Sequence, residues 1–169
     1  ARMIEPDYQP FVTRVWEHYH AHARDDLPWR RTHDPYLVLV SEVMLQQTQV
    51  RRVVAKYTEF TSALPTASAL AEAQLDDVLR IWRGLGYNRR ALALKRAAEI
   101  IVSEYDGHVP DTLEELVRLP GIGHATAAQV LAFAFGVGVP FIETNIRSVY
   151  LHEFFADAEG VPDAAILPL

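Results

Sequence analysis

Apolar residues recur three and four positions apart along most of the chain, which predicts amphipathic helices. This spacing predicts helices at residues 6–23, 35–47, 50–61, 66–70, 74–82, 89–105, 112–119, 124–135 and 143–155. No stretch alternates apolar and polar residues in the way that a half-buried strand does. Because only short polar connections separate the helices, the pattern predicts a compact all-α fold.

Residues at the predicted helix ends support these boundaries. Asp34 is suited to cap the second helix, with Pro35 at its first position, and Thr66 is suited to cap the fourth. Pro120 stops the seventh helix, and Gly136 follows the end of the eighth. The connection between residues 27 and 30 is expected to be a simple turn.

Composition narrows the class of protein. The 169 residues carry a formal net charge of -6 and contain no Cys, which excludes disulfides and thiolate-held metal sites within these residues. No apolar run approaches the roughly 20 residues that a membrane span needs, and the first residues do not form a signal peptide. We expect a cytoplasmic protein of one domain or two small lobes, with no membrane partner.

The negative net charge argues against a protein that coats nucleic acid without specificity, but local charge decides where DNA could bind. Basic residues gather in three places. These are Arg30 with Arg31, Arg51 with Arg52, and the acid-free segment that holds Arg80, Arg83, Arg89, Arg90 and Lys95. Each group is a candidate phosphate contact, and each is equally consistent with a solvated helix face.

One turn between two predicted helices is suited to bind phosphate. Its sequence is LPGIG at residues 119–123, where Pro ends one helix and Gly121 and Gly123 permit a tight turn. The bare N–H groups of the two glycines and of His124 would point toward one place, as at other anion sites on helix N-termini. A plain helix–helix turn would use the same residue types.

This turn resembles the hairpin of the helix-hairpin-helix DNA glycosylase superfamily, which includes endonuclease III. Residues 41–50 (SEVMLQQTQV), with LPWR at 27–30 and GLGY at 84–87, resemble more specifically the mismatch adenine glycosylases of the MutY type. The resemblance covers residues 27–150. It implies a six-helix barrel lobe at 27–135, with the helix-hairpin-helix motif at 112–135. It also implies a second helical lobe from 1–26 and 136–169, incomplete at its C-terminal side.

The resemblance assigns the chemistry to two carboxylates. Glu42 stands in an apolar helix, where burial would keep it protonated as a general acid requires, and the matching Glu of the family protonates the adenine ring. Glu143 matches the second carboxylate, which would offset positive charge on the sugar. The family has Asp there, so Glu143 is a departure, while Asn145 fits the pattern. A helix-capping acid is the alternative for Glu143.

Ala125 takes the position at which endonuclease III carries a nucleophilic Lys. Since Ala cannot attack the sugar, we expect a monofunctional glycosylase without strand cleavage. Gln47 and Tyr87 match residues that fill the gap left by the extruded base. Trp29, Arg30 and Leu45 match positions that line the adenine pocket of the family, although Trp29 could equally belong to the core. Asn145 is a further candidate DNA contact. Arg89, Arg90 and Arg147 are candidate phosphate contacts, with a solvated surface charge as the alternative for each.

The family also implies cofactors. Its hairpin binds a monovalent cation, Na⁺ or K⁺, through main-chain carbonyls that here belong to Val117, Leu119 and Ile122. Many members hold a [4Fe–4S] cluster on four Cys. Because this chain has none, we expect no cofactor within it, and a cluster only in a region beyond Leu169.

Three functions remain open at this stage. The first is excision of adenine opposite guanine or 8-oxoguanine by a monomer that binds double-stranded DNA and works at the bacterial or archaeal nucleoid. The second is excision of another damaged or deaminated base. The third is a helix-hairpin-helix module that binds DNA without chemistry, suggested by Glu143 and Ala125.

Overall fold

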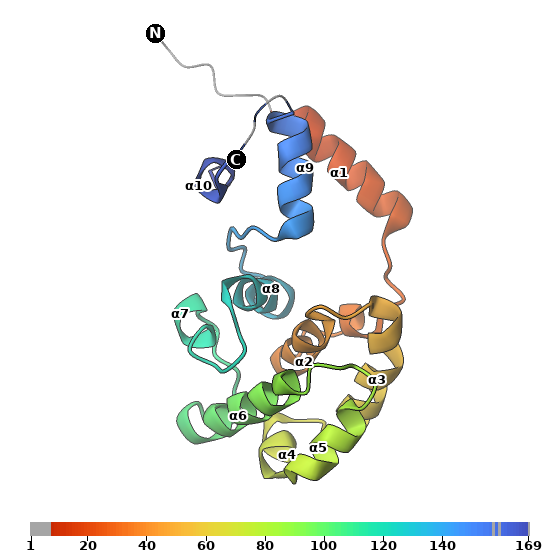
Figure 1. Ribbon diagram of the computed structural model, residues 1–169, viewed down its shortest axis with the longest axis vertical. Helices are drawn as coiled ribbons and strands as arrows, with labels where there is room; N and C mark the ends of the chain where they lie inside the picture. The colour runs from red at the N-terminus through yellow and green to blue at the C-terminus, as the bar shows by residue number, and fades with distance from the viewer. Residues whose placement is uncertain (1–7, 157, 159, 169) are drawn as a thin grey trace.

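The computed structural model describes residues 8–156, 158 and 160–168, and this part of the chain contains helices and no strand (Figure 1). The elements are α1 Gln9–His22, the 3-10 turn η1 Pro28–Arg31, α2 Pro35–Leu45, α3 Val50–Ala63, α4 Ala67–Glu72, α5 Leu75–Trp82, α6 Arg89–Glu104, α7 Leu113–Leu116, α8 His124–Phe135, α9 Thr144–Phe154 and α10 Asp163–Ile166. The predicted all-α fold is confirmed. None of the helices in these ranges combines the length and apolarity that a bilayer span requires.

Several predicted boundaries were wrong. Residues 27–30 were expected to form a simple turn, but Pro28–Arg31 forms the 3-10 turn η1. Helix α10 was not predicted. Helix α2 ends at Leu45, because Gln46 already leaves the helical conformation and Gln47 has a positive φ of 54°. Helix α7 is a single turn where residues 112–119 were expected to be helical. The predicted start of the first helix at residues 6 and 7 lies outside the described residues.

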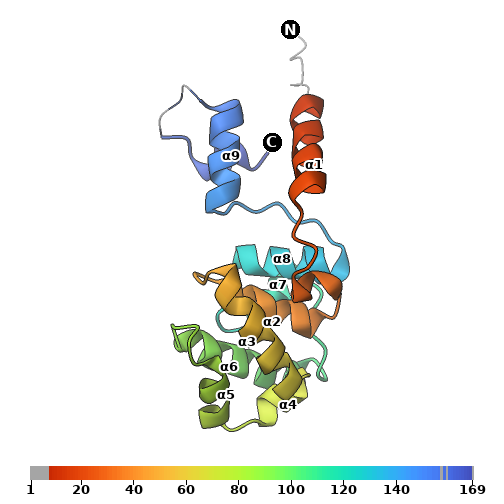
Figure 2. The same ribbon diagram turned by 90° about the vertical axis from the view of Figure 1, so that its right-hand side faces the viewer.

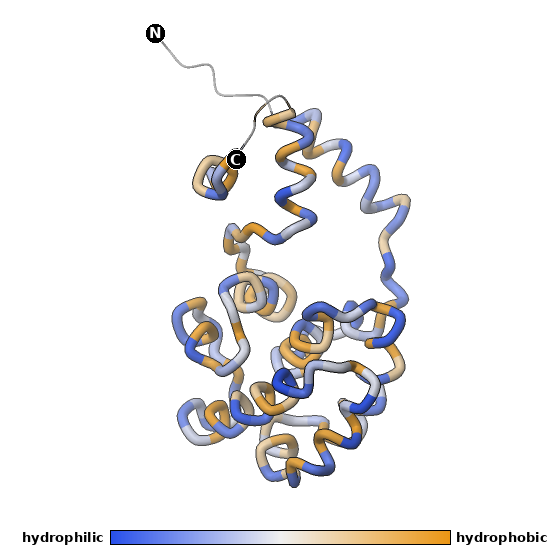
Figure 3. Tube along the Cα trace, viewed as in Figure 1, coloured by the Kyte–Doolittle hydropathy of each residue, from blue (hydrophilic) through white to orange (hydrophobic). Residues whose placement is uncertain are grey.

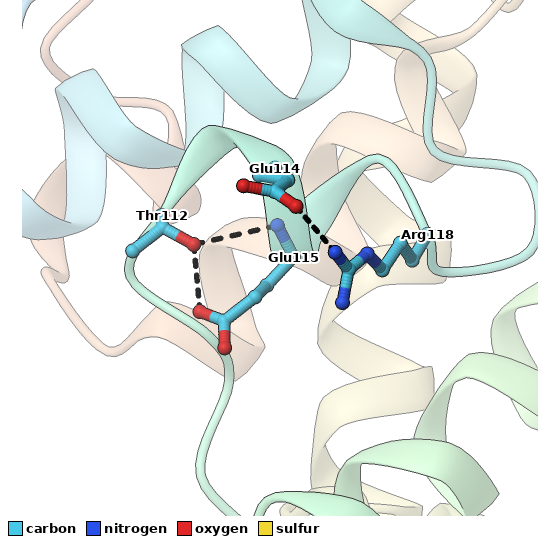
Figure 4. A network of polar contacts seen from close by, with 4 residues as sticks. All are labelled: Thr112, Glu114, Glu115 and Arg118. Carbon is cyan, nitrogen blue, oxygen red and sulfur yellow. Dashed lines mark hydrogen bonds and ion pairs between the residues drawn. The ribbon is translucent and has the colours of Figure 1, made fainter.

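The caps read from the sequence are present. The carboxylate of Asp34 accepts from the N–H groups of Tyr36 and Leu37, and the hydroxyl of Thr66 accepts from Ala69. Thr112 caps α7 in the same way by accepting from the N–H of Glu115, and its own hydroxyl donates to the Glu115 carboxylate at 2.6 Å (Figure 4). These caps fix where α2, α4 and α7 begin.

Helix α2 lies at the centre of the larger part of the molecule. Most of its residues are buried, and it packs against α8, α3 and α6, while α4 and α5 pack against α6 (Figures 1 and 2). The hydrophobic core of the described residues runs from Leu27 to Leu131. A helix that is apolar on nearly all faces must be surrounded by other elements, which explains the central place of α2.

Helices α1 and α9 lie side by side apart from this core (Figures 1 and 2). They meet through edge-to-face rings of Tyr8, Phe11, Tyr150 and Phe154 and through an ion pair of Arg14 with Glu153. Neither helix, each fully described, has a buried residue, and hydrophilic positions are spread along all of α1 (Figure 3). The segment after α8 runs back over that helix, and the first residues of α9 lie at the end of α9 that faces α8 (Figure 2).

Candidate active site

Glu42 is held inside the core by its position on α2. Its side chain is 8% exposed, with Val43 and Met44 beside it in the same helix. Burial disfavours the charged carboxylate and raises the pKa of Glu42 from 4.5 to about 7. A carboxyl group with that pKa is protonated in a large fraction of molecules at neutral pH, so it can act as an acid.

The two glycines of the hairpin differ in whether the fold requires glycine at their positions. Gly121 has a φ of +79°, and a Cβ there would lie 2.8 Å from the Cβ of Ala93 on α6, so the fold itself requires Gly. Gly123 caps α8 with an ordinary φ of -87°, and a Cβ there would meet nothing within 4 Å. The fold would accept other residues at 123. Within the described residues its N–H donates no main-chain hydrogen bond, so it is available to another molecule.

Gln46 connects the end of α2 to this hairpin. Its amide nitrogen lies 3.2 Å from the carbonyl oxygen of Gly121 and 3.2 Å from the hydroxyl of Thr126 on α8. A shift of the hairpin would therefore be transmitted to the helix that carries Glu42.

The two candidate wedge residues lie in one cleft. Gln47 and Tyr87 both line a hollow of about 1030 Å³ that also contains Arg52, Arg80 and Arg83. Both have positive φ, 54° and 47°, and the Tyr87 side chain is 56% exposed. A bulky residue rarely adopts such a backbone conformation without a constraint from its surroundings, and such residues cluster at functional sites.

Arg90, the second residue of α6, constrains the two loops that contain Gln47 and Tyr87. Its guanidinium donates to the main-chain carbonyls of Val43, Met44, Gln46, Leu85 and Gly86 and to the hydroxyl of Thr48. It also lies 5.6 Å from the Tyr87 ring centre. The side chain is 7% exposed, so our interpretation of Arg90 as a phosphate contact was wrong. It ties the end of α2 to the Tyr87 loop instead.

Glu143 occupies the cap of α9. One carboxylate oxygen accepts from the N–H of Ile146 at 2.7 Å, and the other accepts from the side-chain amide of Asn145 at 3.1 Å. The capping role that we considered for Glu143 is therefore real, and it leaves lone pairs on both oxygens. Within the described residues, no hydrogen bond or ion pair joins Glu143 to Glu42. The two carboxylates are placed by separate elements.

The remaining predicted DNA and base contacts fall into two groups. Arg30, Arg89 and His124 are exposed, and Leu45 is partly exposed at the end of α2. Trp29 belongs to the core and packs edge-to-face on Tyr57. Arg147 is engaged within the protein, by an ion pair with Asp163 and a hydrogen bond to the carbonyl of Val161. Its guanidinium joins α9 to α10 and is less available for DNA than we predicted.

The three carbonyls expected at a cation site lie around the hairpin. Leu119 accepts a hydrogen bond from the N–H of Ile122 at 3.1 Å. The carbonyls of Val117 and Ile122 accept no hydrogen bond in the part of the chain that the structure describes. Unpaired carbonyl oxygens are groups that a hard monovalent cation can use.

Sequence reasoning missed three residues at this site. The roles of Arg90 and Gln46 depend on partners more than 40 residues away along the chain, which local patterns do not reveal. Gln129 of α8 faces Glu42, and its signal was available: it is the one polar side chain in the apolar run AAQVLA at residues 127–132. A lone polar residue inside an apolar helix face usually has a buried polar partner.

Comparison with known proteins gives matches over most of the chain. The sequence model described as HhH-GPD superfamily base excision DNA repair protein matches residues 40–166. An adenine DNA glycosylase of Mycolicibacterium smegmatis is 48% identical over 132 residues, 78% of this chain and 45% of that protein. A human adenine DNA glycosylase is 42% identical over 133 residues, 73% of this chain and 24% of that protein. The chain thus spans less than half the length of these curated relatives.

Solved structures share the fold. A thermostable thymine-DNA glycosylase superposes with a TM-score of 0.86 at 27% identity, covering 95% of this chain and 75% of that one. Endonuclease III in a non-covalent complex with DNA superposes with a TM-score of 0.79 at 20% identity, covering 96% and 76%.

Proposed function

We propose that this chain, which belongs to the HhH-GPD superfamily of base excision DNA repair proteins, carries the catalytic part of a monofunctional adenine DNA glycosylase. Its substrate would be adenine opposite guanine or 8-oxoguanine in duplex DNA. The observation that carries the proposal is Glu42, a buried carboxyl group with a pKa near 7 in a chain 48% identical to an adenine DNA glycosylase. The identity extends over 78% of the chain.

The reaction needs an acid for the base and a negative charge for the sugar. Glu42 donates its proton to a ring nitrogen of the extruded base, and the glycosidic bond then breaks with its electron pair passing to the base. The carboxylate of Glu143 offsets the positive charge that develops on the sugar. Water adds to the sugar carbon and releases a proton, which leaves an abasic site.

Ala125 supports a glycosylase that does not cut the strand. The residue lies in the first turn of α8, partly buried, and its methyl group has no nucleophilic atom. Base release by this chain would therefore use water, and strand breaks would appear only after treatment with alkali.

Duplex DNA is the proposed partner. The bare N–H of Gly123 and the first turn of α8 would hold one phosphate, and the cleft with Arg52, Arg80 and Arg83 would follow the backbone on either side of the extruded base. Gln47 and Tyr87 stand in that cleft with exposed side chains, where they would fill the space that the base leaves. Membership of a superfamily of base excision DNA repair proteins supports the same partner.

A monovalent cation would fit at the hairpin. The carbonyls of Val117 and Ile122, with that of Leu119, are the groups that would hold Na⁺ or K⁺. When bound, the ion supplies positive charge beside the phosphate and takes no part in bond cleavage.

Removal of thymine from a mispair is the second candidate. It rests on the similarity to a thymine-DNA glycosylase, 27% identical over 95% of this chain. Both reactions need the same acid and the same extrusion of a base, so they differ only in the groups that line the base pocket.

A single-turnover assay on four duplexes separates these functions. The duplexes contain adenine opposite 8-oxoguanine, adenine opposite guanine, thymine opposite guanine, and only normal pairs, and each is analysed with and without alkali. Glu42→Gln is the test variant, and Glu104→Gln, an exposed acid on α6, is the matched control. We expect alkali-dependent cleavage at adenine that falls by roughly 10²- to 10⁴-fold in Glu42→Gln and stays unchanged in Glu104→Gln.

Other outcomes point elsewhere. Cleavage at thymine alone would keep Glu42 as the acid and replace the substrate. Duplex binding without any base release would favour a binding module and would contradict the proposed chemistry.

A further inference from the structure

Gln129 lies one helical turn after Ala125 on α8, in the helix that packs against α2. It is partly buried, while its neighbours Ala128 and Val130 are fully buried. The methyl side chain of Ala125 has no atom that can form a hydrogen bond. Gln129 therefore supplies the polar side chain that α8 presents to Glu42.

The orientation of the Gln129 amide follows from its two neighbours. The same end of the amide lies 3.3 Å from the carbonyl oxygen of Ala125 and 3.1 Å from Oε2 of Glu42. A main-chain carbonyl can only accept a hydrogen bond, so the group that faces both oxygens is the nitrogen. Its N–H groups donate to Ala125 and to Glu42.

This contact distinguishes the two oxygens of the carboxyl group. Oε2 accepts a hydrogen bond whether Glu42 is protonated or ionised, so the acidic proton resides on Oε1. We propose that Gln129 is a positioning residue, which keeps Oε2 of Glu42 as the acceptor and leaves Oε1 to carry the proton that is transferred to the base. The catalytic part of this inference rests on the proposed function, but the contact itself does not.

Within the described residues, no charged side chain forms a hydrogen bond or ion pair with Glu42. Burial is the cause that raises the pKa of Glu42. On the elements packed around α2, Arg90 of α6 is bonded to carbonyls, and Tyr57 of α3, whose pKa is raised to about 12, is uncharged at neutral pH as any tyrosine is. His124, the titratable residue of α8, and Arg30 of η1 are exposed, and neither bonds to Glu42 among the described residues.

The first test follows Glu42 directly. Carboxyl ¹³C shifts of glutamate-labelled protein are titrated by NMR, with the Glu42 signal assigned by its loss in Glu42→Gln. Removing the amide in Gln129→Met takes away a donor that stabilises the carboxylate, so the pKa of Glu42 rises. Gln129→Glu raises it further, because two carboxylates then share one site. Gln74→Met, an exposed glutamine before α5, leaves it unchanged.

The second test uses single-turnover base release as a function of pH. Gln129→Met lowers the plateau about tenfold, the effect of one ordinary hydrogen bond on a rate. It also moves the alkaline limb to higher pH, in step with the NMR titration. In a Glu42→Gln background the same substitution has no further effect, because the group that it positions is gone.

An unchanged Glu42 titration in both Gln129 variants would overturn the inference, whether or not the protein is active. An equal rate loss in the Glu42→Gln background would also overturn it, since that result indicates general damage to packing. Failure of the proposed function looks different: wild-type protein releases no base, while the Gln129 variants still shift the pKa of Glu42.

Discussion

The part of the molecule from η1 to α8 and the pair α1 and α9 are stabilised in different ways. The first has a continuous hydrophobic core from Leu27 to Leu131. The second consists of fully described helices without a buried residue, joined by aromatic edges and an ion pair. Since apolar burial dominates stability, local opening should cost much less free energy in the second region than in the first.

The two candidate carboxylates are divided between these regions. Glu42 owes its raised pKa to the core, whereas Glu143 is placed by a local cap and by its neighbour Asn145. A group that needs a shifted pKa has to be in a well-packed region, while a group that supplies only charge can be placed by a few hydrogen bonds.

Arg90→Met should have the largest effect on the core region. It leaves the carbonyls at the end of α2 and in the Tyr87 loop without their buried donor, so the free energy of unfolding should fall by about 3 kcal/mol. Arg89→Met, the exposed neighbour, should change it by less than about 0.5 kcal/mol. Urea unfolding measures both. Equal effects of the two variants would mean that Arg90 does not hold the two loops.

Glu42 should make the stability of the core depend on pH. The native pKa of about 7 lies above the unfolded value of 4.5, so between these values the unfolded chain releases a proton that the native protein keeps. Relative to Glu42→Gln, the contribution of Glu42 to the free energy of unfolding is therefore fully present below pH 4.5. This contribution is lost as the pH rises to about 7, and the total loss is about 3 kcal/mol. Thermal unfolding of both proteins between pH 5 and 8 would measure this loss. Parallel curves would show that Glu42 is not held protonated.

The two hairpin glycines should separate stability from binding. Gly121→Ala adds a Cβ that clashes with Ala93 and places Ala in the positive φ that Gly121 already has, so it should destabilise the protein by about 1–3 kcal/mol. Gly123→Ala should change stability by less than about 0.5 kcal/mol, because its Cβ meets nothing, yet weaken duplex binding. Unfolding curves and fluorescence anisotropy with labelled DNA provide the two measurements. Full DNA affinity in Gly123→Ala would remove the hairpin from the interface.

Glu143→Ala should destabilise the protein least among these variants, and its effect should be confined to α9. Loss of the cap should cost α9 about 1 kcal/mol, and its amides should exchange faster with deuterium, while those of α2 and α8 keep their protection. Hydrogen exchange followed by mass spectrometry resolves the two regions. If protection falls in α2 as well, the two regions unfold together and the division proposed above is wrong.

Local sequence signals predicted the helices well, but they did not predict the hydrogen bonds between residues that are far apart in the sequence. The caps by Asp34 and Thr66 depend on residues two or three positions away, so they could be read directly. The burial of Glu42 followed from its apolar helix. Arg90 resembles any other basic residue at a helix start until Val43 and Met44 are brought to it from more than 40 positions away. Arg147 was misread for the same reason, because α10 was not predicted.

The left-handed backbone at Gln47 and Tyr87 has a consequence for how such a protein evolves. Glycine adopts this conformation without a steric penalty, so selection for heat resistance alone would favour Gly at both positions. It would also discard the side chains that the cleft presents to solvent. Resistance to heat and the proposed filling of the space left by the base are thus opposing demands at these two positions, and a laboratory lineage selected only for the first should lose the second early.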